Sequence, residues 1–202
     1  PNVKDTLRSQ TALMWAAAEG HTEAVRTLIE AGARADAVSQ SGITPLMFAI
    51  RAGHIETTLA LLDRGSSAQA TSPDGTTMLG LAIINAHWEL ASRLLDRGAD
   101  ANGKDPRGRP LQMLAFMRRA ENRGLSAWLP RKDRDTSASI DFARALLAHG
   151  ARINERIEFS NPNYSPTHMA MGGPGTTWVG ATPLYIAAKN CDIDFIRFLT
   201  GH

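Results

Sequence analysis

The side chains best suited to chemistry in this sequence are five carboxylates: Glu121, Asp133, Asp135, Glu155 and Glu158. Two carboxyl groups about 5–9.5 Å apart suffice for glycoside hydrolysis, in which one acts as an acid and the other as a nucleophile or base. No motif fixes the distance between any two of the five, and carboxylates in loops are usually only hydrated. They are weak catalytic candidates, and a hydrolase, in particular a glycoside hydrolase, is the alternative function.

Histidine and cysteine indicate structure more than catalysis. His21, His54 and His87 are spaced by 33 residues, which predicts one structural role repeated along the chain. Cys191 is the only cysteine, so the chain has neither an internal disulfide nor a cysteine metal cluster. The motifs His-Glu-x-x-His, Gly-x-Ser-x-Gly and the phosphate-binding loop are absent from the sequence. We expect no metal site and no cofactor.

A cluster of basic residues between positions 104 and 134 suggests an acidic partner, such as an acidic protein surface or an anionic glycan. Only Asp105, Glu121 and Asp133 oppose it there. The alternative is that the cluster forms a hydrated surface without a partner. Its nine members are Lys104, Arg107, Arg109, Arg118, Arg119, Arg123, Arg131, Lys132 and Arg134.

The composition is that of a folded protein. The 202 residues are 43% apolar and 21% charged, which is enough to bury a core. The net charge of +2 is too small to indicate a nucleic-acid partner, and no apolar run approaches the roughly 18 residues of a membrane helix. We expect a soluble monomer, either cytoplasmic or secreted if a signal peptide once preceded Pro1.

The elements that would position these residues recur every 33 residues. Leu13, Leu46 and Leu79 have this spacing, and so do Gly32, Gly65 and Gly98, in register with the histidines. Three residue types that share one period indicate an internal repeat.

Each repeat predicts two short helices. Thr44 is expected to cap the first helix, Pro45 to occupy its first position and Gly53 to end it in a left-handed conformation. The second helix carries a leucine pattern and stops at Gly65. Because so short a pair is unable to bury its own apolar face, the repeats must stack on one another.

The motifs Gly42-Ile-Thr-Pro-Leu46, Gly53-His54 and Gly98-Ala-Asp-Ala-Asn102 resemble ankyrin repeats. The resemblance implies an all-α ankyrin-repeat solenoid of about five helix-turn-helix repeats with hairpin loops, L-shaped and slightly curved. We expect one domain, 1–202, with repeats at about 6–38, 39–71, 72–103, 104–155 and 156–202. At the position of the repeated histidine the last repeat has Asp192, which is expected to loosen it.

Two insertions interrupt the period. One is expected at 120–138, between the helices of the fourth repeat, and the other at 156–178, in the hairpin before the last helix pair. Loops this long are uncommon without a purpose or disorder. Similar units interrupted by long loops resemble repeat proteins of environmental bacteria. The chain stops at Thr200-Gly-His202, within the pattern, so that further repeats or a truncated cap are both open.

In ankyrin proteins the partner usually contacts the hairpin tips and the exposed face of the first helices. Carried over to this sequence, together with the aromatic residues of the insertions, these positions predict ten binding residues: Arg51, Ile84, Asn85, Phe116, Met117, Trp128, Tyr164, Trp178, Lys189 and Asn190. Ile84, Phe116 and Met117 are apolar where exposure is expected, which is typical of binding sites. The alternative is that the insertions cover these three residues and that the aromatic residues pin the loops.

The sequence therefore predicts a binding scaffold more than an enzyme. We expect another protein, or an acidic or glycan ligand, in a concave groove over repeats three to five that both insertions border. Because a fold does not define a function, the identity of the partner is beyond the sequence.

Overall fold

The computed structural model of the protein describes residues 1–118, 136–158 and 179–202. Its secondary structure in these residues is helical, with ten helices and no strand beyond isolated bridges between hairpin residues. The predicted all-α repeat fold is confirmed. None of the helices in these ranges is long and apolar enough to cross a membrane.

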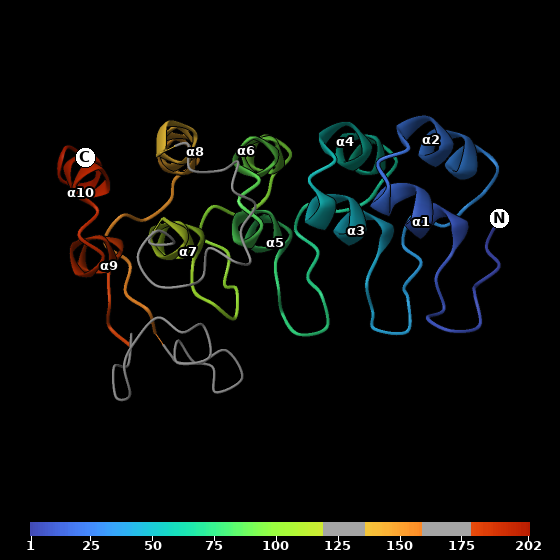
Figure 1. The fold of residues 1–202 in the computed structure, drawn as a ribbon, viewed down its shortest axis with the longest axis horizontal. Helices are drawn as coiled ribbons and strands as arrows, with labels where there is room; N and C mark the ends of the chain where they lie inside the picture. Colours follow the sequence, from blue (N-terminus) through green and yellow to red (C-terminus); the bar gives the residue numbers. More distant parts are fainter. Residues whose placement is uncertain (119–135, 159–178) are drawn as a thin grey trace. The chain divides into compact units, whose positions relative to one another are not determined.

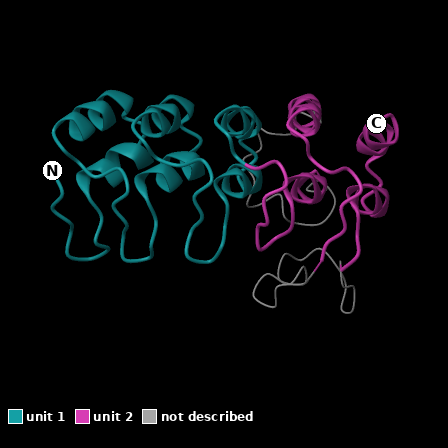
Figure 2. Cartoon of the chain, turned by 180° about the vertical axis from the view of Figure 1, so that it is seen from behind, with its two compact units in different colours: residues 1–99 teal, residues 100–202 magenta. Residues whose placement is uncertain are grey.

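The chain divides into two compact units, Pro1–Ala99 and Asp100–His202 (Figure 2). The boundary falls between the third and fourth predicted repeats, so each unit contains whole helix pairs. The prediction of a single domain stays a prediction.

The first unit contains three helix pairs in two layers (Figure 1). The first helices α1, α3 and α5 lie side by side in one layer, and α2 packs on α4 in the other. Hairpins project from the layer of first helices. The bounds are α1 Ala12–Ala18, α2 Thr22–Glu30, α3 Pro45–Ala52, α4 Ile55–Asp63, α5 Met78–Ile84 and α6 Trp88–Asp96.

The second unit repeats this construction. Helix α7 packs on both α8 and α9, and α9 packs on α10. The bounds are α7 Pro110–Met117, α8 Thr136–Ala148, α9 Pro183–Lys189 and α10 Ile193–Thr200. Helix α8 begins at Thr136, so residues 136–138, which the sequence analysis assigned to the first insertion, are helical.

A threonine caps the first helix in four of the five pairs, as predicted for Thr44. The Thr44 hydroxyl accepts a hydrogen bond from the Met47 amide at 3.3 Å, which satisfies a helix N–H that would otherwise lack a partner. In the fourth pair Arg109 occupies this position. Here the Gln112 side-chain oxygen accepts a hydrogen bond from the Arg109 backbone amide at 2.9 Å.

The repeated glycine and histidine form one device that joins neighbouring repeats. Gly53 ends α3 with a φ of 80°, a left-handed conformation that favours glycine. The His87 ring of the next repeat lies against it, and its Nε2 bonds the Arg51 carbonyl at 3.2 Å. His54 bonds the Ala18 carbonyl in the same way at 3.0 Å. The predicted structural role of these two histidines is confirmed.

The second insertion leaves a closed hairpin. The Ile157 amide donates to the Ala181 carbonyl at 3.0 Å, and the Gly180 amide donates to Ile157 at 2.8 Å. Ser72 and Thr76 form the corresponding pair in an uninterrupted repeat, at 2.9 Å. An equivalent backbone hydrogen bond therefore closes the hairpin with and without the insertion. The extra residues come after Ile157, and the helix capped by Thr182 begins as in the other repeats. The predicted start at residue 156 is therefore slightly early.

Comparison of Gly53→Ala with Gly65→Ala tests the glycine–histidine device. Both glycines have a positive φ, so each substitution should cost about 1–2 kcal/mol from the backbone alone. A Cβ at Gly53 would lie 2.6 Å from the His87 ring, whereas one at Gly65 meets nothing within 4 Å. Gly53→Ala should therefore reduce the free energy of unfolding in urea by at least about 1 kcal/mol more. Equal losses would contradict the proposed role of His87.

Thr58 provides a second test, because its side chain is fully buried and its hydroxyl has no hydrogen-bond partner among the described residues. Val25 occupies the equivalent position one repeat earlier. Thr58→Val keeps the shape and removes the unsatisfied hydroxyl, so it should stabilise the protein by about 1 kcal/mol. The measurement is the thermal unfolding midpoint, and a lower midpoint than that of the unsubstituted protein would count against this prediction.

Candidate binding surfaces

In the first unit, the C-terminal ends of the first helices supply the exposed side chains predicted for binding. Helix α3 buries every residue from Pro45 to Ile50, and only Arg51 and Ala52 are exposed. One repeat away, Ile84 and Asn85 at the end of α5 are half-buried. We call these positions at the ends of α3 and α5 the first-helix surface.

Arg51 is held in place at this surface. Its guanidinium lies over the Phe48 ring, 5.1 Å from the centroid, and its carbonyl accepts the hydrogen bond from His87. Asn85 is less available, because its amide donates to the Leu81 carbonyl at 2.8 Å. Arg51 therefore presents a partly preorganised cation, and Asn85 is partly engaged in its own helix.

Some exposed apolar side chains were not among the predicted site residues. Trp15 on α1 is 55% exposed, although Phe48 at the same position of the next repeat is 7% exposed. In the second unit Leu184 and Tyr185 are 36% and 55% exposed, whereas their equivalents Leu46 and Met47 are buried. The sequence pattern marks all of them as core positions, and only the absence of a described neighbouring helix pair distinguishes them.

In the second unit the predicted binding residues differ in exposure and in their contacts. Phe116 and Met117 are half-buried and Lys189 is exposed. Asn190 has a structural contact, since its amide donates to the Ala115 carbonyl at 3.2 Å and connects the end of α9 to α7. Trp128, Tyr164 and Trp178, and with them the walls of the predicted groove, lie outside the described residues.

The described part of the basic cluster is already neutralised. Lys104 pairs with Glu158 at 2.9 Å, Arg107 with the fully buried Asp105 at 3.0 Å. Arg109 bonds Glu155 at 2.8 Å and Glu158 at 3.3 Å, and Arg118 bonds Asp192. The remaining five members, Arg119, Arg123, Arg131, Lys132 and Arg134, lie outside the described residues. The four described cations therefore do not form an open surface for an extended polyanion.

The two described carboxylates of the hydrolase alternative share one cation. Glu155 and Glu158 both bond the Nη2 atom of Arg109. The pKa of Glu158 is lowered, chiefly by the hydrogen bond from Lys104, whereas a general acid needs a raised pKa. Glu121, Asp133 and Asp135 lie outside the described residues. The described geometry therefore gives no support to glycoside hydrolysis.

Asp192 does not loosen the last repeat, contrary to the expectation from sequence. Its carboxylate caps α10 by accepting the Phe195 amide at 3.1 Å. It also receives two bonds from Arg118, at 2.7 and 3.0 Å. The Arg118 guanidinium lies 5.0 Å from the Phe195 ring centroid, and its side chain is only 4% exposed. An ion pair thus occupies the place of the histidine bond and connects α7 to α10.

These features define a class: a helical-repeat scaffold that presents side chains from successive repeats, without an assembled catalytic group among the described residues. The family model for ankyrin repeats, in three copies, matches residues 1–72. Residues 1–72 thus carry ankyrin repeats, and the helix pairs beyond residue 72 continue the same construction. A search of curated proteins found no match. Ankyrin repeats are generally protein–protein interaction modules.

Arg118→Ala tests the ion pair in the second unit. Removal of one partner leaves Asp192 largely buried without its counter-charge, so the substitution should reduce the free energy of unfolding by about 3 kcal/mol. Arg197→Ala is the matched control, because Arg197 is exposed and lies 3.7 Å from Asp194; it should change stability by less than about 0.5 kcal/mol. Urea unfolding followed by circular dichroism measures the free energy of unfolding of both variants. Similar losses in the two would show that the Arg118–Asp192 ion pair stabilises the protein no more than an exposed pair does.

Proposed function

We propose that this ankyrin repeat protein binds another protein through the first-helix surface of its first unit and the adjoining hairpins. The observation that carries the proposal is the exposure pattern of α3, which buries six consecutive residues and exposes Arg51 and Ala52 at its end. The equivalent positions in the neighbouring repeats carry Ala18 and Ile84, so the repeat construction does not require an arginine here.

The physical state of Arg51 suits recognition. Arginine is enriched among the residues that dominate binding energies, because its planar guanidinium combines charge, hydrogen bonds and stacking. The contact with Phe48 restricts the side chain before binding, which reduces the entropy lost on association. In the second unit we propose the same role for Phe116, Met117 and Lys189, at the corresponding ends of α7 and α9.

A protein partner suits this surface better than an extended anionic glycan. Arg51 stands beside the small Ala52, and Ile84 and Asn85 add apolar and amide groups one repeat further on. Protein interfaces combine such groups with arginine. A sulfated or acidic glycan would instead need several cations, and Arg51 is the only cation among these four residues.

Capture from a lysate, followed by affinity measurement on the captured partner, tests the proposal. Arg51→Ala should weaken binding about tenfold or more, the effect of removing an interface residue of central weight. Arg93→Ala is the matched control, because Arg93 is an exposed arginine on the second helix α6. The control should retain affinity. Equal affinity of the unsubstituted protein and Arg51→Ala, or equal loss in both variants, would place the binding surface elsewhere.

A further inference from the structure

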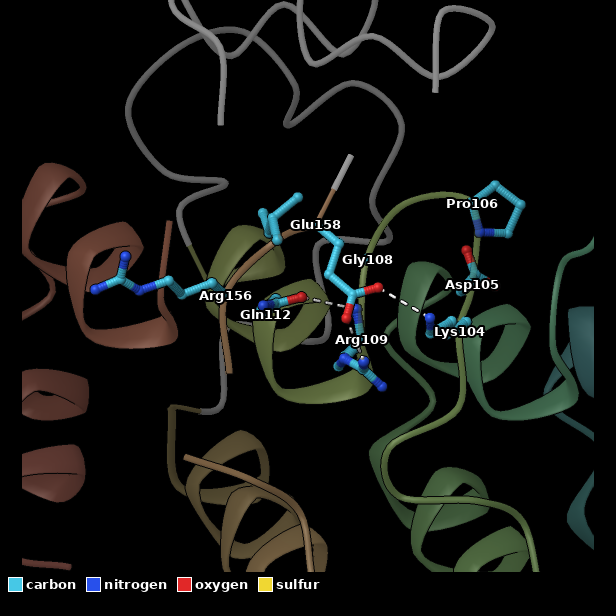
Figure 3. Close-up of a pocket in the computed structure, with 9 residues that line it drawn as sticks. Lys104, Asp105, Pro106, Gly108, Arg109, Gln112, Arg156 and Glu158 are labelled. Atoms are coloured by element: carbon cyan, nitrogen blue, oxygen red, sulfur yellow. Dashed lines mark hydrogen bonds and ion pairs between the residues drawn. The ribbon is translucent and has the colours of Figure 1, made fainter. Parts of the chain in front are cut away.

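A small cavity lies in the second unit between the hairpin that precedes α7 and the segment that follows α8 (Figure 3). It is small and partly open to solvent, and its lining includes Lys104, Arg109, Gln112, Arg156 and Glu158. Charged side chains therefore make up much of its lining.

One carboxylate already occupies the cationic part of this cavity. Figure 3 shows the Glu158 carboxylate between the Lys104 ammonium and the Arg109 guanidinium. Its Oε2 lies 2.9 Å from Lys104 Nζ, and its Oε1 lies 3.3 Å from Arg109 Nη2. Two cations that converge on one carboxylate form an arrangement suited to bind that group.

Arg109 is held by more contacts within the protein than Glu158 is. The Arg109 side chain is 14% exposed, donates to the Asn102 carbonyl at 2.7 Å and bonds Glu155 at 2.8 Å. Glu158 is 51% exposed, and its pairs with Lys104 and Arg109 are open to water, where ion pairs contribute little. Arg109 therefore keeps its position if the Glu158 side chain turns away.

The backbone next to Glu158 is fixed independently of its carboxylate. Ile157 is bonded on both sides to Gly180 and Ala181 in the closed hairpin. Rotation of the Glu158 side chain therefore does not require the hairpin to open. It would leave Lys104 and Arg109 facing the cavity, while the negative charge of Asp105 stays paired with Arg107.

Arg156 adds positive charge to the same rim. It lines the cavity and makes no ion pair with a described residue, and Figure 3 shows its side chain directed away from Glu158.

We propose that Lys104 and Arg109 form a binding site for an acidic peptide segment of the partner, in which a glutamate or aspartate of the partner replaces Glu158. In the free protein Glu158 acts as an internal competitor that lowers affinity and disfavours weakly acidic partners. The inference rests on the proposed function, since it names the chemistry of a partner segment, but it concerns a different surface from that of Arg51.

The test uses a fluorescein-labelled hexaglutamate peptide and its hexaglutamine counterpart, with fluorescence anisotropy of the full chain at low ionic strength. Glu158→Gln removes the competitor charge and should tighten hexaglutamate binding about three- to fivefold, the upper part of the range for exposed ion pairs. Adding Lys104→Gln to Glu158→Gln should abolish this gain. Hexaglutamine should bind none of the proteins.

Glu89→Gln is the matched control, because it makes the same change in net charge at an exposed glutamate of α6. It should leave the affinity for hexaglutamate unchanged within twofold. No gain with Glu158→Gln, an equal gain with Glu89→Gln, or a gain that survives Lys104→Gln would each overturn the inference. None of these results bears on the partner affinity of Arg51→Ala, so the failure of this site and that of the proposed function are distinguishable.

Discussion

The helices in the described part of the chain are seven to thirteen residues long, and isolated helices of this length are marginal in water. Their stability comes from the side chains that each pair buries against the next. Leu13, Leu46 and Leu79, which share one position in successive repeats, are all at most 2% exposed. Because each such leucine contributes roughly 1.5–3 kcal/mol, the stacking of neighbouring pairs carries most of the stability within each unit.

Stacking alone does not set the register between repeats, and a set of polar bonds does so. His54 and His87 reach the carbonyl groups of the preceding first helix. On the second helices, Glu30 bonds Arg64 at 2.8 Å and Asp63 bonds Arg97 at 2.6 Å. These ion pairs are exposed, so each adds little to stability. Their common spacing specifies which residues of adjacent repeats face one another.

In the second unit, ion pairs between charged side chains connect the helix pairs, and they also involve the residues of the candidate sites. Arg118 and Asp192 replace a histidine-to-carbonyl bond by a largely buried ion pair. Arg109 connects the fourth hairpin to Glu155 and Glu158, beside the point where the second insertion leaves the described chain. Residues that look like free cations in the sequence thus have structural partners. A binding site made from them must work by exchange of one carboxylate for another.

The sequence by itself determined the repeat period, the helix pairs, the threonine caps, the left-handed glycines and the structural histidines. These features depend on contacts that are local or that recur at a fixed spacing, so a pattern of residue types reveals them. Only the tertiary structure decided the partners of Arg109, Arg118 and Asp192, because those bonds join residues up to 74 positions apart across an insertion. The exposure of Trp15 and Tyr185 was also beyond the pattern, since burial depends on whether another helix pair lies against a position.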